Sequence, residues 1–222
     1  VKWEAELPSS IKLAYLPSEN RVRLRLSTRG LNEELLNDQI EVQIEKLYDI
    51  IPELIFGEEQ DRLEQRIGAE LLKRNATIAT AESCTGGYLA HLITRVAGAS
   101  AYYKGSVLAY DNSIKETVLG VNPQTILAFG AVSKQVVEEM ALGIKQVMKV
   151  DYSVAISGIS GPLGGTKEKP VGTVWTAVAG PNGVQSSKRQ MGTERLWNIK
   201  RSASVSLLDL LHVLESSDKK VE

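Results

Sequence analysis

Residues 80–87 read TAESCTGG, in which the carboxylate of Glu82, the hydroxyls of Ser83 and Thr85 and the thiol of Cys84 lie beside a pair of glycines. A short apolar run precedes this segment and a helix-like segment follows it. Ser83 in such a turn can act as a nucleophile, with the helix N-terminus stabilising an oxyanion or a phosphate. Ser83 or Thr85 can equally well serve as the N-cap of that helix. Cys84 is the only cysteine, and a lone free cysteine is more often a small buried apolar residue than a nucleophile.

A nucleophilic serine needs a base. The sequence contains only two histidines. His91 lies eight residues beyond Ser83 in the same predicted helix and His212 lies near the end of the last one, so a Ser-His-Asp triad is not favoured. The remaining bases are Tyr110 and Lys115 of the segment YDNSIK. Read alone, these two are a strand-end tyrosine and a surface lysine, whereas a desolvated lysine beside the serine would be a neutral base.

A third segment that could contribute to a site is the loop at residues 157–165, SGISGPLGG, at the end of a predicted strand. It is either a flexible surface loop or a nest of backbone N–H groups for phosphate or carbonyl oxygens. It is not a Walker loop, because it lacks the G-K-[ST] ending. It does not open a helix as a dinucleotide-binding fingerprint does.

The elements that must position these segments alternate between strands and helices. Strands are predicted at residues 76–81, 102–110 and 152–157, helices lie between them, and two further strands at 171–180 and 183–191 form a hairpin. A long helix from about residue 195 to 214 closes the chain. This order predicts an α/β fold, a three-layer α/β/α sandwich with a mostly parallel, mixed sheet. The polar segments would then meet where the strands end.

Residues 1–57 have a different order of predicted elements. Alternating segments IKLAYL and RVRLRLSTRG predict a hairpin, an amphipathic helix follows, and PELIFG predicts a short strand. We therefore expect two domains, a small α+β domain at 1–57 and the sandwich at 58–222. Arginines on the hairpin are expected to pair with the acidic helix.

Composition excludes several classes of function. The formal net charge is −1, so no global field draws the chain to nucleic acid or an anionic membrane. One cysteine and two distant histidines make a poor zinc site, and no metal is expected, although a carboxylate-based magnesium site stays open. No apolar run approaches membrane-spanning length and no signal-peptide pattern is present, so we expect no membrane association and a cytoplasmic location.

Three separated segments in the same order, TAESCTGG, YDNSIK and SGISGPLGGTKEKPVGTVW, resemble the C-terminal domain of the competence/damage-inducible CinA family. The resemblance runs over most of residues 59–214. The segment LPSSIKLAYLPSENRVRLRLSTRG also resembles the middle, KH-like segment of CinA proteins. The resemblance implies a longer parent chain with an N-terminal nucleotide-pyrophosphatase-like domain, which is absent here, and we expect a homo-oligomer.

The resemblance implies nicotinamide mononucleotide (NMN) amidohydrolase activity, which converts the carboxamide to a carboxylate and releases ammonia without a cofactor. The family's serine, tyrosine and lysine fall on Ser83, Tyr110 and Lys115, and its loop threonine falls on Ser157. The loop departs from the family's GPGGG pattern at Leu163. The complete set of expected substrate contacts is Glu82, Thr85, Gly86, Gly87, Ser157, Gly158, Gly161, Gly164, Gly165, Arg195 and Arg201.

Two other classes of function stay open. One is a nucleotide-binding or regulatory module that keeps the pocket without catalysis. The other is RNA binding by the first domain, which KH-type folds often perform. Residues 1–57 contain seven Lys and Arg against ten Asp and Glu and lack a G-x-x-G loop. We therefore expect a docking or assembly element, with no nucleic-acid partner and a pyridine nucleotide as the small-molecule substrate.

Overall fold

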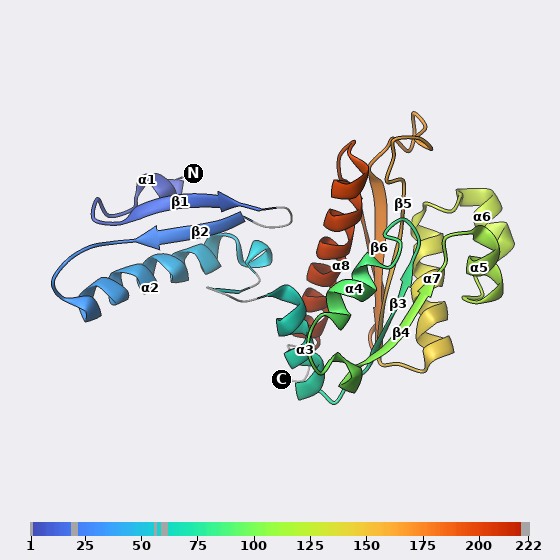
Figure 1. Ribbon diagram of the computed structural model, residues 1–222, viewed down its shortest axis with the longest axis horizontal. Coiled ribbons are helices and arrows are strands. Elements are labelled where there is room, and N and C mark those ends of the chain that lie inside the picture. The colour runs from blue at the N-terminus through green and yellow to red at the C-terminus, as the bar shows by residue number, and fades with distance from the viewer. Residues whose placement is uncertain (1, 19–21, 56, 59–61, 219–222) are drawn as a thin grey trace. The chain divides into compact units, whose positions relative to one another are not determined.

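The computed structural model describes residues 2–18, 22–55, 57–58 and 62–218. The chain divides into two compact units, residues 1–58 and 59–222, one residue beyond the predicted boundary. Figure 1 shows each unit with its own sheet and helices. The residues discussed above as candidates for chemistry all belong to the second unit.

The second unit is built on a five-stranded sheet of order β4-β3-β5-β6-β7. Strand β3 (Ile78–Glu82) is central to its parallel part, between β4 (Tyr103–Leu108) and β5 (Tyr152–Gly158). Strands β6 (Thr173–Gly180) and β7 (Gly183–Gln190) continue the sheet in antiparallel fashion and join at a tight turn. The predicted mixed sheet with a C-terminal hairpin is therefore confirmed.

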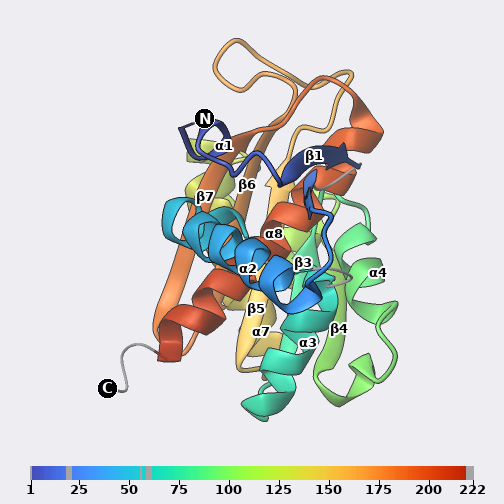
Figure 2. The same ribbon diagram turned by 90° about the vertical axis from the view of Figure 1, so that its left-hand side faces the viewer.

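Helices cover both faces of this sheet, as Figures 1 and 2 show. Helix α7 (Lys134–Met148) packs on one face, and its N-cap is Ser133, whose hydroxyl accepts from the Val136 N–H. The opposite face carries α8 (Arg195–Asp218), with α3 (Leu63–Lys73) and α4 (Tyr88–Thr94) beside it. The second unit is therefore the three-layer sandwich that the alternation of strands and helices predicts. Two short helices, α5 (Asn112–Thr117) and α6 (Pro123–Phe129), connect β4 to α7.

The core lies between these layers, and the positions of its apolar residues explain which face of each helix packs on the sheet. Val136, Val137, Met140 and Ile144 form a buried stripe at helical spacing on α7 and meet the buried alanines of the strands. Small strand residues leave room for the helix to pack against the sheet. Glu82 is opposite Leu108 in β4 and Ile156 in β5, so the three parallel strands end at the same edge.

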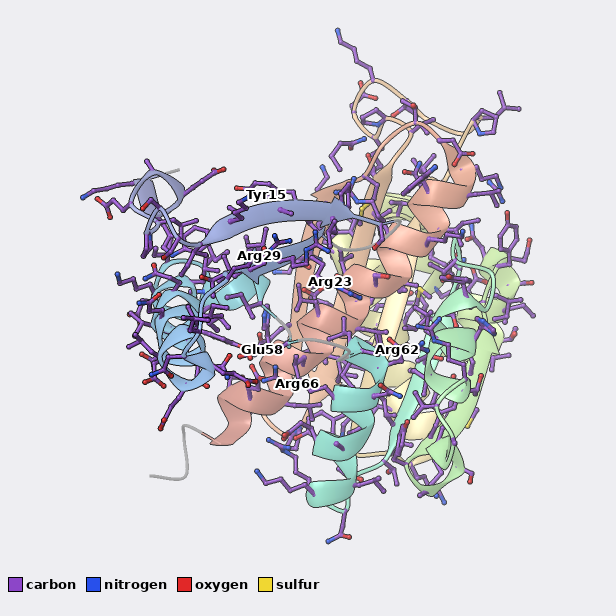
Figure 3. All side chains as sticks on the ribbon, turned by 60° about the vertical axis from the view of Figure 1, so that its left-hand side comes forward. Tyr15, Arg23, Arg29, Glu58, Arg62 and Arg66 are labelled. Atoms are coloured by element: carbon purple, nitrogen blue, oxygen red, sulfur yellow. The ribbon has the colours of Figure 1, made fainter. Side chains whose placement is uncertain are left out.

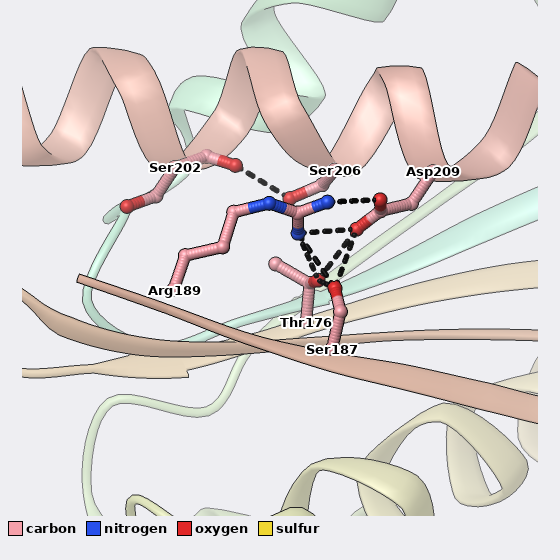
Figure 4. A network of polar contacts seen from close by, with 6 residues as sticks. All are labelled: Thr176, Ser187, Arg189, Ser202, Ser206 and Asp209. Carbon is pink, nitrogen blue, oxygen red and sulfur yellow. Dashed lines mark hydrogen bonds and ion pairs between the residues drawn. The ribbon is translucent and has the colours of Figure 1, made fainter. Parts of the chain in front are cut away.

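The contact between α8 and the sheet also contains a network of polar groups (Figure 4). Half-buried Arg189 of β7 donates to both carboxylate oxygens of half-buried Asp209, at 2.5 and 2.8 Å, and the hydroxyls of Thr176 and Ser187 donate to the same carboxylate. Thr176 is the buried member of this network, and its hydroxyl has a hydrogen-bond partner, as buried polar groups usually do.

The first unit contains α1 (Lys2–Ala5), a two-stranded antiparallel hairpin of β1 (Lys12–Pro17) and β2 (Val22–Ser27), and helix α2 (Glu33–Ile50). The hairpin and the helix agree with the prediction. The expected third strand in PELIFG is wrong where the structure describes it, because Pro52–Leu54 form a 3-10 turn. Proline at the start of that segment has no N–H to donate to a strand ladder and fits the first position of a helical turn. The KH-like character of this unit stays a prediction.

The expected pairing of the hairpin arginines with α2 is wrong for the hairpin arginines that the structure describes, and Arg21 lies outside the described residues. Within the described residues, neither Arg23, labelled in Figure 3, nor Arg25 forms an ion pair. Strand alternation explains this result, because Leu24 and Leu26 are half-buried whereas Arg23 and Arg25, which alternate with them, are exposed. Tyr15, also labelled in Figure 3, instead ties β1 to α1 by donating to Glu4 at 2.9 Å.

Candidate active site

The strand ends of the second unit surround a cavity of about 260 Å³. Segments far apart in the sequence contribute to its wall, because the parallel strands β3, β4 and β5 end at one edge. The lining residues are Ser83, Cys84, Tyr110, Asn112, Lys115, Ala131, Val132, Ser157, Gly158, Ile159, Ser160, Gly161, Leu163, Gly164 and Arg195. The three segments singled out in the sequence thus meet at one cavity.

The turn after β3 is organised by Glu82, whose side chain is fully buried. Its carboxylate accepts hydrogen bonds from the Thr85 hydroxyl at 2.7 Å and from the N–H groups of Gly87, Leu89 and Ala90 at 2.8–3.1 Å. The cap of α4 is therefore a carboxylate at the end of the preceding strand, and neither Ser83 nor Thr85 fills that role. The first N–H groups of α4 are occupied and are not available to an oxyanion.

Four expected substrate contacts in this turn lie outside the cavity wall. Glu82 and Thr85 are buried with each other, whereas Gly86 and Gly87 are not among the lining residues. The two glycines have φ values of +62° and +94°, a backbone region that side chains with a Cβ rarely adopt. Their role is the sharp turn that leaves Ser83 at the edge of the cavity.

Cys84 lines the cavity but is poorly suited to attack. Burial raises the pKa of its thiol to about 12, although a hydrogen bond with Ser160 favours the thiolate slightly. The thiol is therefore neutral at pH 7, and the thiolate is the nucleophilic form of cysteine. Its neighbour Gly158 has no room for a side chain, because a Cβ there would lie 3.0 Å from Cys84 Sγ.

Lys115 is the most unusual residue of the wall, since a lysine is rarely 1% exposed. Its Nζ donates to the carbonyl oxygens of Ala109 at 2.7 Å and Tyr110 at 3.2 Å. Burial lowers the pKa of Lys115, and the charge of Asp111 opposes this shift. The two carbonyls occupy two N–H donors of the amine, and this arrangement is compatible with either its neutral or its protonated form.

Tyr110 stands at the mouth of the cavity, where it is 60% exposed. Its hydroxyl accepts a hydrogen bond from Arg195 Nη2 at 3.3 Å, and Arg195 Nη1 donates to the Gly161 carbonyl at 2.7 Å. Arg195 therefore joins two sides of the wall. Arg201, the other expected contact on α8, is exposed and does not line the cavity.

The loop after β5 brings four of its five expected contacts to the wall, Ser157, Gly158, Gly161 and Gly164, but not Gly165. The Ser157 hydroxyl donates to the Ala131 carbonyl at 2.8 Å, so its proton is not available to an oxyanion. Gly161 has φ +84°, and a Cβ there would lie 2.4 Å from Val171. Leu163, where the loop departs from the family pattern, is 86% exposed.

Several wall residues were not predicted from the sequence. Asn112, Ile159 and Ser160 lie within the segments singled out in the sequence but were not named as site residues, whereas Ala131 and Val132 lie outside those segments. Neither histidine lines the cavity, and His91 is exposed on α4. Among the described residues, no three His, Cys, Asp or Glu side chains are placed to hold a metal ion. In the same described part, no helix has both the length and the apolar character to cross a membrane.

The fold and the cavity define an α/β domain with its site at the carboxyl ends of parallel strands, and comparison with known proteins identifies its family. Residues 60–214 match the family model of the CinA C-terminal domain. A CinA-like protein of Cytophaga hutchinsonii is 47% identical over 94% of this chain and 50% of its own length. A CinA-like protein of Flavobacterium psychrophilum is 46% identical over 92% of this chain and 49% of its own. The chain belongs to the CinA family and spans about half the length of these curated relatives.

Solved structures agree with this assignment. The competence/damage inducible protein CihA from Agrobacterium tumefaciens has a TM-score of 0.67 and 35% identity, and the match covers 72% of this chain and 98% of that one. The competence-damaged protein (CinA) superfamily protein from Enterobacter cloacae has a TM-score of 0.66 and 30% identity, with the same coverage.

Proposed function

We propose that the second unit is a nicotinamide-nucleotide amidohydrolase that hydrolyses the carboxamide of NMN to a carboxylate. The observation that carries this proposal is the buried, carbonyl-bound Lys115 in the same cavity wall as Ser83. The resemblance to the CinA family suggests the substrate, and the cavity wall contains a serine, a lysine whose pKa is lowered by burial, and backbone N–H groups that are unpaired within the described residues.

In the first half of the reaction, Ser83 Oγ attacks the amide carbon and its proton passes to Lys115 Nζ. Since burial lowers the pKa of Lys115, the neutral amine that accepts this proton is more populated than in a solvated lysine. The C–N bond of the tetrahedral intermediate then breaks, the nitrogen takes the proton from Lys115, and ammonia leaves. The product is an ester between Ser83 and the nicotinoyl group.

In the second half, water attacks the ester carbon and gives one proton to Lys115 Nζ. The bond between the carbon and Ser83 Oγ breaks, and Lys115 returns the proton to the serine. Nicotinate mononucleotide is released and both side chains regain their starting forms. Cys84, whose pKa is raised to about 12, stays a thiol throughout.

Backbone N–H groups supply the oxyanion donors in this proposal. Those of Cys84, Ser160 and Gly161 belong to wall residues and have no acceptor within the described part of the chain. Unpaired donors fixed before the reaction stabilise negative charge without reorganising, and each such donor contributes on the order of 10²-fold to turnover.

The charges of the wall suit a phosphate-bearing substrate. Its formally charged side chains are Lys115 and Arg195, and no carboxylate is among the lining residues that the structure describes. With Lys115 neutral, Arg195 is the cation left for the phosphate. The positive pyridinium ring of NMN also withdraws electrons from the carboxamide carbon, which favours attack by the serine.

A direct assay tests the proposal. We expect the purified chain to convert NMN to equal amounts of ammonia and nicotinate mononucleotide, with or without a chelator. Hydroxylamine should divert part of the product to the hydroxamate, because the serine ester is open to that nucleophile. Binding of NMN without ammonia release would instead support the catalytically silent nucleotide-binding module. Loss of activity with chelator and recovery with a divalent ion would contradict the metal-free mechanism.

A further inference from the structure

Asn198 is a fully buried amide on the first turns of α8, with 1% of its surface exposed. It does not line the cavity, and the mechanism above does not use it. Its Nδ2 donates to the carbonyl oxygens of Ser160 at 3.0 Å and Gly192 at 3.1 Å, so both donors of one amide are occupied. A buried amide with this geometry fixes two backbone segments at once.

The Ser160 contact controls the direction of the next N–H group. In a trans peptide the C=O and N–H bonds point in opposite directions within one plane. Because the Ser160 carbonyl faces Asn198, the N–H of Gly161 faces away from α8. Gly161 lines the cavity, and its N–H has no acceptor within the described residues. The carbonyl of Gly161 itself is held by Arg195, which lies in the same helical turn as Asn198.

Ser160 also links Asn198 to the nucleophile turn. Its hydroxyl donates to the Cys84 carbonyl at 3.2 Å, and Cys84 follows Ser83 directly. Asn198 therefore binds the carbonyl of the Ser160–Gly161 peptide, whose N–H belongs to Gly161. The Ser160 side chain in turn contacts the turn that contains Ser83. All of these contacts lie within the second unit.

We propose that Asn198 is a positioning residue that aims the Gly161 N–H at a substrate oxygen. The inference rests on the proposed amidohydrolase function and adds to it the device that orients one oxyanion donor. Asn198 acts through the Ser160–Gly161 peptide and does not touch the substrate. Its loss should lower kcat more than it raises KM, because the donor matters most when negative charge develops.

The first experiment compares Asn198→Ala with Ser206→Ala in steady-state NMN hydrolysis. Ser206 is a matched control, since it is fully buried on the same helix and its hydroxyl donates to the Ser202 carbonyl, away from the cavity wall (Figure 4). We expect Asn198→Ala to lower kcat by about 10- to 100-fold with less than a threefold change in KM, as the loss of one oriented donor implies. Ser206→Ala should keep kcat within about twofold of the unmodified chain, the scatter usual for a substitution remote from a site. Equal kcat values for both variants would overturn the inference.

The second experiment needs neither turnover nor an Asn198 variant. The Gly161 amide resonance is followed by NMR in ¹⁵N-glycine-labelled Ser83→Ala protein while nicotinate mononucleotide is added. We expect a downfield shift of the Gly161 N–H, with the Gly86 and Gly180 amides as references outside the cavity wall. Shifts at Gly158 or Gly164 without one at Gly161 would overturn the inference and leave the proposed function intact. No shift at any of the three wall glycines, together with no ammonia release by the unmodified chain, would overturn both.

Discussion

The turn at residues 82–87 and the loop at residues 158–165 both carry glycines, and both follow strands that end at the same edge of the sheet. Their backbone N–H groups nevertheless have different partners. In the turn, Glu82 accepts from Gly87, Leu89 and Ala90, so the helix start is satisfied within the protein. In the loop, the N–H groups of Ser160 and Gly161 have no acceptor among the described residues. The turn positions the Ser83 side chain and adds the N–H of Cys84, which is also unpaired in the described part of the chain, whereas the loop offers the successive N–H groups of Ser160 and Gly161.

This difference shows how two similar glycine-containing segments can have different roles in one site. A buried carboxylate that caps a helix stabilises the turn and presents Ser83, but it removes the helix N-terminus as an anion site. The loop is held from outside by Arg195 and Asn198, which bind the carbonyls of Gly161 and Ser160, while the N–H groups of these two residues have no acceptor among the described residues. Substitutions in the two segments should therefore affect different quantities.

The largest effect is expected at the residue that the turn presents. Ser83→Ala should lower kcat by at least about 10³-fold, as the loss of a nucleophile does in serine hydrolases, with its melting temperature unchanged. Cys84→Ala is the matched control in the adjacent position, and it should retain kcat within about tenfold because it removes packing and no chemical group of the reaction. An inactive Cys84→Ala protein together with an active Ser83→Ala protein would reverse the assignment of the nucleophile.

The next largest effect is expected at Lys115. Lys115→Arg keeps a positive charge but cannot release its proton, so kcat should fall by about 10²- to 10⁴-fold while NMN still binds. Lys115→Ala should lose a similar factor in kcat. If the arginine variant keeps near-normal turnover, Lys115 acts through its charge and Tyr110 moves the proton.

The pH profile of kcat sharpens this test. The neutral amine is the active form, so kcat should be low at acidic pH and rise to a plateau as Lys115 loses its proton. Since burial lowers the pKa of Lys115, the rise should be centred below the ordinary lysine value of 10.5. The residual activity of Lys115→Ala should lack this rise, and a profile that keeps it would assign the titration to another group.

Some features of the site could be predicted from the sequence, and others follow only from the folded structure. Parallel strands must end at one edge, so the meeting of Ser83, Tyr110 and Lys115 follows from the alternation of strands and helices. The hydrogen-bond partners of Glu82 and Asn198 do not follow from this alternation. Asn198 and Ser160, for example, are 38 residues apart, and no local sequence pattern indicates their contact. The 3-10 turn at Pro52–Leu54 was missed because a short apolar segment reads equally as a strand.

A smaller effect on activity, but a clear effect on stability, is expected at Glu82. Glu82→Gln replaces one acceptor oxygen with an NH₂ group that faces backbone N–H donors. Leaving a buried donor unsatisfied costs about 1–3 kcal/mol, which lowers Tm by roughly 3–10 °C for a protein of this size. Calorimetry compares this variant with Glu168→Gln, a control substitution at an exposed residue three positions after the loop at 158–165. A Glu82→Gln protein with unchanged Tm and weakened NMN binding would make Glu82 a substrate contact.

The smallest effects separate the two arginines of α8. Arg195 bridges Gly161 and Tyr110 at the mouth of the cavity, whereas Arg201 is exposed and lies about 9 Å further along the helix axis at 1.5 Å per residue. Arg195→Ala should raise KM for NMN by about 10- to 100-fold, because a hydrogen bond to a charged group contributes roughly 1.5–3 kcal/mol. Arg201→Ala should change KM by less than about twofold, as a surface substitution usually does.

Nicotinamide riboside, which lacks the phosphate, identifies what Arg195 contacts. If Arg195 binds the phosphate, the riboside should be a poorer substrate of the unmodified chain, and Arg195→Ala should not weaken it further. If Arg195 only holds the loop through Gly161, the substitution should weaken both substrates by the same factor. An effect of Arg201→Ala on NMN that matches that of Arg195→Ala would place the phosphate along the outer face of α8 and contradict the cavity as its site.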